Sequence, residues 1–208
     1  METRDLIQLL SRRAHAVEHR HAPWRWAAGM GSGLLVAVAL LWPRMPVGSG
    51  REAMAARTAY GFDIAIATAL GAAALSLAMR LGQPGGPVRR GWLLLALPLG
   101  WLALVGAMEW SQMPAGVPDT SWRMFVTHVL WLYVPIFTAA CWCMRGQAPT
   151  RLAPAGAAAG ALAGALATLV CMLFGLDLAM SPWPLWHVLG VAVPALAGTL
   201  LGPTVLRW

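Results

Sequence analysis

Residues 152–174 read LAPAGAAAGALAGALATLVCMLF, a run of twenty-three residues without a charged side chain. At a rise of about 1.5 Å per residue, a helix of this length crosses a hydrocarbon core of about 30 Å. Gly156, Gly160 and Gly164 recur at every fourth position within the run. This spacing puts the three glycines on one helix face, where another helix can approach closely. The pattern predicts helix packing through these glycines, either inside one bundle or between two copies in a homo-oligomer.

Five more apolar stretches of similar length flank this one. The predicted spans, in addition to residues 152–174, are residues 26–42, 60–79, 92–108, 124–144 and 183–201. Of the 208 residues, 59% are hydrophobic and only 11% are charged, whereas a soluble domain typically has about a quarter of its residues charged. The sequence therefore predicts an all-α membrane protein, a bundle of six transmembrane helices over residues 26–208 that contacts the lipid bilayer.

The arginines predict the orientation of this bundle. All fifteen basic residues are arginine, and with the N-terminus inside, eleven lie in inner segments and four in outer loops. Loops on the cytoplasmic side carry the excess of positive charge, so both termini are predicted to be cytoplasmic. The net charge of +7 then reflects topology, and no direct binding of nucleic acid is expected.

Residues 1–25 are the one sizeable stretch outside the predicted spans that has a helical pattern. An amphipathic helix is predicted here, since its apolar residues recur at helical spacing with Asp5 near the start. The candidate partner-binding residues are Asp5, Leu6, Ile7, Leu10 and Val17. From periodicity alone, two interpretations stay open: a helix on the inner membrane surface, or a docking helix for a cytosolic protein.

A second candidate site lies at the predicted outer ends of the spans. Its residues have side chains of the kinds that bind metals or protons, namely Asp63, His128, Cys171, Asp177 and His187. No two of them show the spacing of metal ligands, so the alternative is a set of separate residues at the membrane interface. They are a candidate cluster for sensing a signal.

Motifs for catalysis are missing from the sequence. It contains no Ser-His-Asp arrangement, phosphate-binding loop or zinc motif, so neither an enzyme nor a cofactor is predicted. Cys141 and Cys143 are two apart on one predicted helix and cannot form a disulfide with each other. A small multi-pass transporter or permease subunit is the alternative function, although no charged pair lies in the middle of the spans.

Several stretches together resemble a known family. They are the opening Asp5-Leu6-Ile7, GWLLLALPLGW at residues 91–101, Trp122-Arg123, WHVLG at 186–190, GTLLG at 198–202 and LRW at 206–208. In this combination the chain resembles the NrsF-type membrane anti-sigma factors, the negative regulators of sigma F. The resemblance covers the whole chain, including its six spans.

The resemblance implies a function for residues 1–25. They would hold a sigma factor of the extracytoplasmic-function (ECF) type at the membrane and release it on an envelope or stress signal. The family commonly has cysteines where Met124 and Gly175 stand, and tyrosine where His187 stands. These departures argue against thiol-based sensing in this chain, while the segment that would hold the sigma factor is intact.

Overall fold

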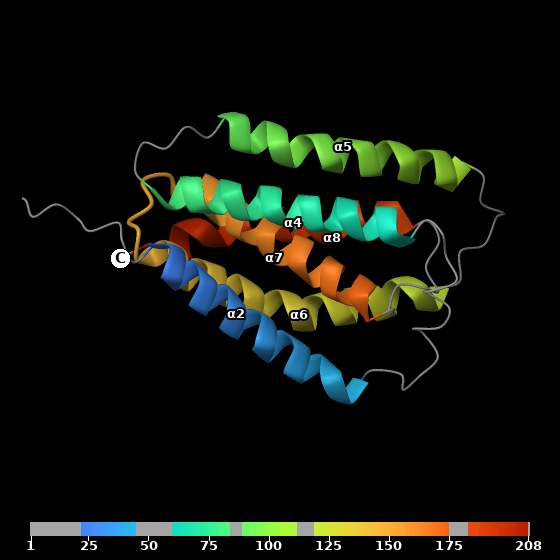
Figure 1. Ribbon diagram of the computed structural model, residues 1–208, viewed down its shortest axis with the longest axis horizontal. Helices are drawn as coiled ribbons and strands as arrows, with labels where there is room; N and C mark the ends of the chain where they lie inside the picture. Colours follow the sequence, from blue (N-terminus) through green and yellow to red (C-terminus); the bar gives the residue numbers. More distant parts are fainter. Residues whose placement is uncertain (1–21, 45–59, 84–88, 112–118, 175–182, 208) are drawn as a thin grey trace, which may run out of the picture.

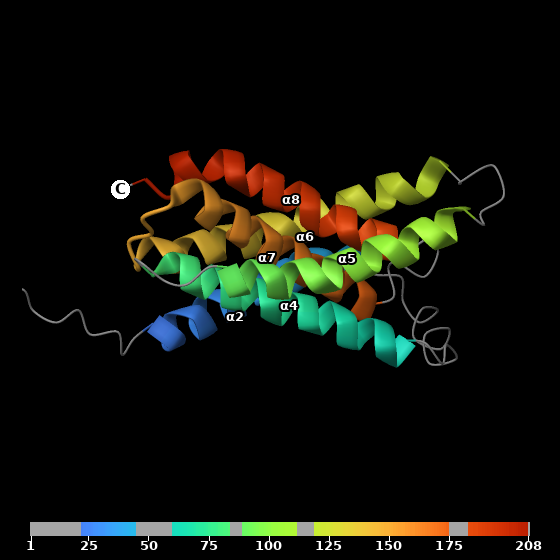
Figure 2. The same ribbon diagram turned by 90° about the horizontal axis from the view of Figure 1, so that it is seen from above.

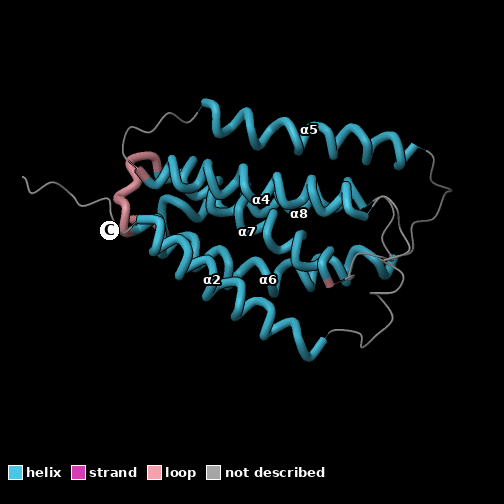
Figure 3. The backbone as a smooth tube through the Cα atoms, in the orientation of Figure 1, coloured by secondary structure: helices cyan, strands magenta, loops and turns pink. Residues whose placement is uncertain are grey.

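The computed structural model describes residues 22–44, 60–83, 89–111, 119–174 and 183–207. Within these ranges the chain forms helices and loops without a strand (Figure 3). The helices are α2 (Ala22–Leu41), the short 3-10 helix η2 (Trp42–Arg44), α4 (Tyr60–Gly82), α5 (Arg89–Ser111), α6 (Asp119–Arg145), α7 (Leu152–Leu173) and α8 (Trp183–Val205). Six of them are long and apolar enough to cross a membrane, which confirms the all-helical prediction with six candidate spans for the described residues.

Several helices extend beyond the predicted spans. α2 begins at Ala22, four residues before the expected start, and α6 begins at Asp119, five residues early. The predicted limits were set by charged and polar residues, which mark the edge of a hydrocarbon core. A helix does not have to end there, because its backbone hydrogen bonds are made internally on both sides of that edge.

Helix α7 lies at the centre of the bundle, packed against α8, α4 and α6 (Figures 1 and 2). Sixteen of its twenty-two residues are buried, most of them alanine or glycine. Small side chains let the neighbouring helices come close to the α7 backbone on several sides. The stretch that predicts the membrane fold therefore also forms its core.

The remaining two helices lie at the edges of the bundle. α2 packs on α6, while α5 packs on α4 and α8 (Figure 1). Only four residues of α5 are buried, Gly91, Leu95, Leu102 and Gly106, and most of its other large apolar side chains are exposed. A helix in water would not leave such a surface uncovered, whereas one in lipid can.

The six helices alternate in direction, so that one end of the bundle collects the starts of α2, α5 and α7 and the ends of α4, α6 and α8 (Figure 1). We call it the root end, because residues 1–21 precede α2 there. The described arginines at this end are Arg25, Arg80, Arg89, Arg90, Arg145, Arg151 and Arg207. The opposite end holds Arg44, Arg123 and all three described acidic residues, Asp63, Glu109 and Asp119. The described charges therefore differ in sign between the two ends.

Candidate functional site: the root of the N-terminal segment

The first turn of α2 joins the predicted partner-binding segment to the bundle. The residues predicted to bind a partner, Asp5, Leu6, Ile7, Leu10 and Val17, lie outside the described residues. Trp26 is only 3% exposed and belongs to the core, so the chain is fixed in the bundle one residue after Arg25. The site can therefore be built from this point.

Arg25 connects the start of α2 to the end of α6. Its Nη2 donates a hydrogen bond to the Trp142 carbonyl oxygen at 3.1 Å, and its guanidinium lies 4.7 Å from the centre of the Trp142 ring. The Trp142 carbonyl is one of the last four of α6, which have no partner within the helix and carry the negative end of its dipole. Arg25 thus caps α6 and stacks on its last turn at the same time.

The two helix backbones come close together around this contact. The Cys143 thiol donates to the Arg25 carbonyl oxygen at 3.3 Å. A Cβ on Gly29 would run into the Cys143 sulfur, and a Cβ on Gly146 would run into the Arg25 guanidinium. Glycine at both positions therefore makes room for the contact between α2 and α6.

The end of α6, just before the turn to α7, is bound to the end of α8. Arg145 Nε donates to the carbonyl oxygen of Val205, the last residue of α8, at 2.6 Å. Ala148 in the turn has a φ of 56°, a left-handed conformation that costs a non-glycine residue about 1–2 kcal/mol. At the root end, Arg25 of α2 thus caps the carboxyl end of α6, and Arg145 of α6 caps the carboxyl end of α8.

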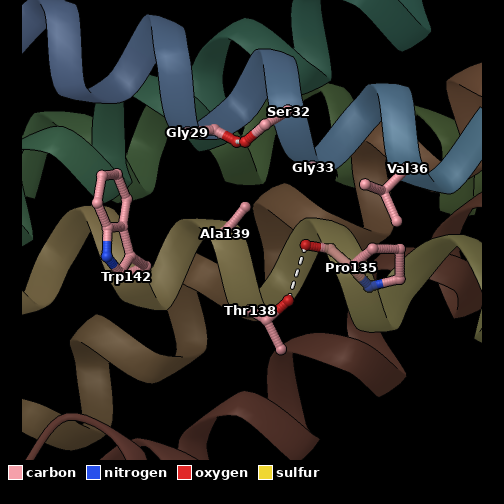
Figure 4. Close-up of a pocket in the computed structure, with 8 residues that line it drawn as sticks. All are labelled: Gly29, Ser32, Gly33, Val36, Pro135, Thr138, Ala139 and Trp142. Atoms are coloured by element: carbon pink, nitrogen blue, oxygen red, sulfur yellow. Dashed lines mark hydrogen bonds between the residues drawn. The ribbon is translucent and has the colours of Figure 1, made fainter.

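A groove runs along the contact between α2 and α6 (Figure 4). It has a volume of about 430 Å³ and is lined by Gly29, Ser32, Gly33, Val36, Pro135, Thr138, Ala139 and Trp142. Pro135 has no N–H to continue the hydrogen bonds of α6, and the Thr138 hydroxyl donates to the Pro135 carbonyl at 2.9 Å. The Trp142 indole extends from α6 toward α2 at one end of the groove (Figure 4). Arg25 stacks on this ring.

The sequence contains a signal for one part of this site, the close approach of α2 to another helix. Gly29 and Gly33 have the same four-residue spacing as the glycines of α7, and a Cβ on Gly33 would lie 2.7 Å from the Ala139 Cβ. This spacing could have predicted a close partner for α2. The carbonyls that Arg25 and Arg145 reach lie 117 and 60 residues away, and no local pattern predicts such contacts.

The predicted outer residues are spread over several helices. Cys171 on α7 and His187 on α8 are buried, and His128 on α6 is half-buried. Asp63 lies in the first turn of α4, its side chain is not described, and Asp177 lies outside the described residues. Among the described residues no three His, Cys, Asp or Glu side chains form a group that could hold a metal.

The glycines of α7 face α8. A Cβ on Gly160 would lie 2.8 Å from the Pro194 carbonyl carbon, and one on Gly164 would lie 3.0 Å from the Val191 Cα. A Cβ on Gly156 would lie 2.6 Å from the Gly202 Cα. This stripe is therefore covered by α8 of the same chain, and a second copy could reach it only by displacing α8.

Comparisons with known proteins cover the whole chain. The family described as "Negative regulator of sigma F" (NrsF) matches residues 10–208. The chain is 32% identical over 215 residues to the probable anti-sigma-F factor NrsF of Azospira oryzae, and 30% identical over 219 residues to the anti-sigma-F factor NrsF of Caulobacter vibrioides. Both alignments cover 100% of each protein, and no solved structure matches. On this evidence the chain belongs to the NrsF family of negative regulators of sigma F.

Proposed function

We propose that this protein is an anti-sigma factor of the bacterial inner membrane whose residues 1–25 bind a sigma factor of the ECF type. The observation that carries the proposal is the full-length match to two curated anti-sigma-F factors of the same family. The role is regulatory rather than catalytic. The partner-binding face comprises Asp5, Leu6, Ile7, Leu10 and Val17.

The charges of the bundle support an orientation with both termini in the cytoplasm. The root end holds seven described arginines and no described acidic residue, while the opposite end holds two arginines and three acidic residues. Arginine on the flanks of spans favours the cytoplasmic side. Residues 1–21 then extend into the compartment that contains RNA polymerase.

The mechanism follows from competition. A sigma factor held by the N-terminal segment cannot dock on core RNA polymerase, so its promoters stay silent. A signal received by the bundle would lower the affinity of the segment for the sigma factor. A loss of about 1.4 kcal/mol in binding free energy reduces that affinity tenfold, so a modest change at the root of the segment is enough.

The test is the double substitution Leu6→Glu with Leu10→Glu, assayed by co-purification of the sigma factor and by a reporter of its target promoter. If the apolar face docks on the sigma factor, each glutamate places a charge in an apolar contact at a cost of several kcal/mol. Sigma recovery should fall to background, and the promoter should become constitutively active. The protein should still insert in the membrane, because no apolar span is changed.

The matched control is Gln8→Glu with His15→Glu, which adds two negative charges to the opposite side of the predicted helix. This variant should retain the sigma factor and keep the promoter silent. Equal recovery from the two double variants would remove the apolar face from the mechanism. If even the unaltered protein recovers no sigma factor, the anti-sigma function itself is wrong.

A further inference from the structure

Arg25, at the start of α2, contacts α6 through few interactions. The Arg25 guanidinium makes one hydrogen bond to the Trp142 carbonyl and stacks on the Trp142 ring, while its buried Nε finds no acceptor among the described residues. A buried donor without an acceptor carries a desolvation cost that offsets part of what the other contacts contribute. The unsatisfied Nε therefore lowers the net stabilisation that Arg25 gives to the contact between α2 and α6.

We propose that the contact between Arg25 and Trp142 is a clasp that opens, and that its opening frees the first turn of α2 from α6 and repositions residues 1–21. This inference rests on the proposed function, in which those residues hold the sigma factor. The clasp lies at the root of that segment, so a small movement there changes the position of everything that precedes it in the chain.

The groove between α2 and α6 makes such a movement feasible. Trp142, one of the two residues of the clasp, lines the root side of the groove together with Gly29. The groove leaves a hollow of about 430 Å³ along one side of this contact, while the two backbones stay close at Gly33 and Ala139. α2 can move against α6 there with fewer lost contacts than a fully packed interface would give up.

The other side of the clasp is attached to the core. Arg145, three residues after Trp142, holds the end of α8 through the Val205 carbonyl. α8 in turn lies backbone to backbone on α7 at Gly156, Gly160 and Gly164. A displacement within the packed helices therefore reaches α6 at the residues that form the clasp.

Coupling of this kind is reciprocal. If the state of the clasp changes the affinity of the segment for the sigma factor, then a bound sigma factor must change the population of the open clasp by the same factor. The clasp can thus be observed from either side, through sigma binding or through the exposure of a residue beneath it.

Cys143 reports the state of the clasp. Its side chain is 0% exposed and lies against Gly29 and the Arg25 carbonyl, so opening should expose it. The experiment uses the full chain in native membranes with Cys141→Ala and Cys171→Ala, which leaves Cys143 as its one thiol. The rate of its modification by N-ethylmaleimide is measured with and without the co-expressed sigma factor.

The decisive comparison is Arg25→Ala against Arg89→Ala. Both remove one arginine from the root end, and Arg89 is exposed on α5, away from α6. Arg25→Ala should raise the rate of Cys143 modification about tenfold or more, the change that 1.4 kcal/mol makes in an equilibrium, and Arg89→Ala should leave it unchanged. Trp142→Leu, which removes the ring but keeps the carbonyl, should also raise the rate, and it serves as the test if Arg25→Ala is not produced.

The sigma factor provides the second comparison. In the protein with an intact clasp its presence should change the modification rate several-fold, and with Arg25→Ala that dependence should be lost. Equal modification rates for Arg25→Ala and Arg89→Ala would overturn the clasp. So would a modification rate that stays the same in the presence of a sigma factor that does co-purify. If no sigma factor co-purifies with the unaltered protein, the proposed function fails, and the coupling inferred from it fails with it; the comparison of the two arginine variants would then report only on the α2–α6 contact.

Discussion

Replacement of Gly160 by alanine should destabilise the bundle, although alanine is the better helix former. The added Cβ would lie 2.8 Å from the carbonyl carbon of Pro194 and 3.0 Å from the Ala195 Cα, and closer still to the Pro194 oxygen. All three atoms belong to the backbone of α8 and cannot rotate away. α8 therefore has to retreat from α7 along a contact that runs from Gly156 to Gly164.

The expected loss follows from two opposing effects. Ordinary contact of a Cβ begins at 3.4 Å, so the carbonyl carbon must move by at least 0.6 Å, and the nearer oxygen by more. Overpacking of this kind costs about 1–3 kcal/mol, and the upper part of that range applies because backbone lies on the receiving side. Alanine regains up to about 1 kcal/mol through its helix propensity. We expect a net loss of about 1–2 kcal/mol in the free energy of unfolding.

The assay is unfolding of the purified protein in detergent micelles by titration with sodium dodecyl sulfate, followed by circular dichroism. Gly100→Ala is the matched control, since Gly100 is also in the middle of a helix but nothing lies within 4 Å of its added Cβ. This variant should be as stable as the unaltered protein or slightly more so. If Gly160→Ala and Gly100→Ala unfold at the same detergent composition, α8 does not lie against α7 in the way described.

Two further predictions concern topology and the cysteines. Reporter fusions should give a cytoplasmic signal at Arg12, Gly85 and Trp208 and a periplasmic signal at Gly48 and Ala115. A periplasmic signal at Arg12 would reverse the orientation and place residues 1–21 on the side of the membrane without a sigma factor. Replacement of Cys141 and Cys171 together by alanine should leave an inducible promoter response unchanged apart from modest losses of stability, since both are buried and neither is in a disulfide. Loss of the response in a protein that still inserts would identify a thiol as the sensor.

Length and apolarity predicted the number of helices because a segment in lipid must satisfy its backbone hydrogen bonds within itself. The neighbours of each helix were not predicted, since a glycine stripe shows that some helix comes close without saying which. The pattern that identifies the neighbour of α7 lies in the sequence of α8. There Gly190, Pro194, Gly198 and Gly202 repeat at the same four-residue spacing. Two stripes of equal period can lie against each other over their whole length, and the structure pairs these two.

The contacts of individual arginines could not be predicted from the sequence. The arginine count treats all the arginines at the root end alike, as residues that favour the cytoplasmic side. In the structure Arg25 and Arg145 have a further role, because each donates to a carbonyl at the carboxyl end of another helix. Such carbonyls exist wherever an antiparallel bundle alternates helix ends, so arginines placed there for topology already have acceptors within reach. An arginine that orients α2 in the membrane can in this way also bind α2 to α6, and the proposed clasp depends on this second role.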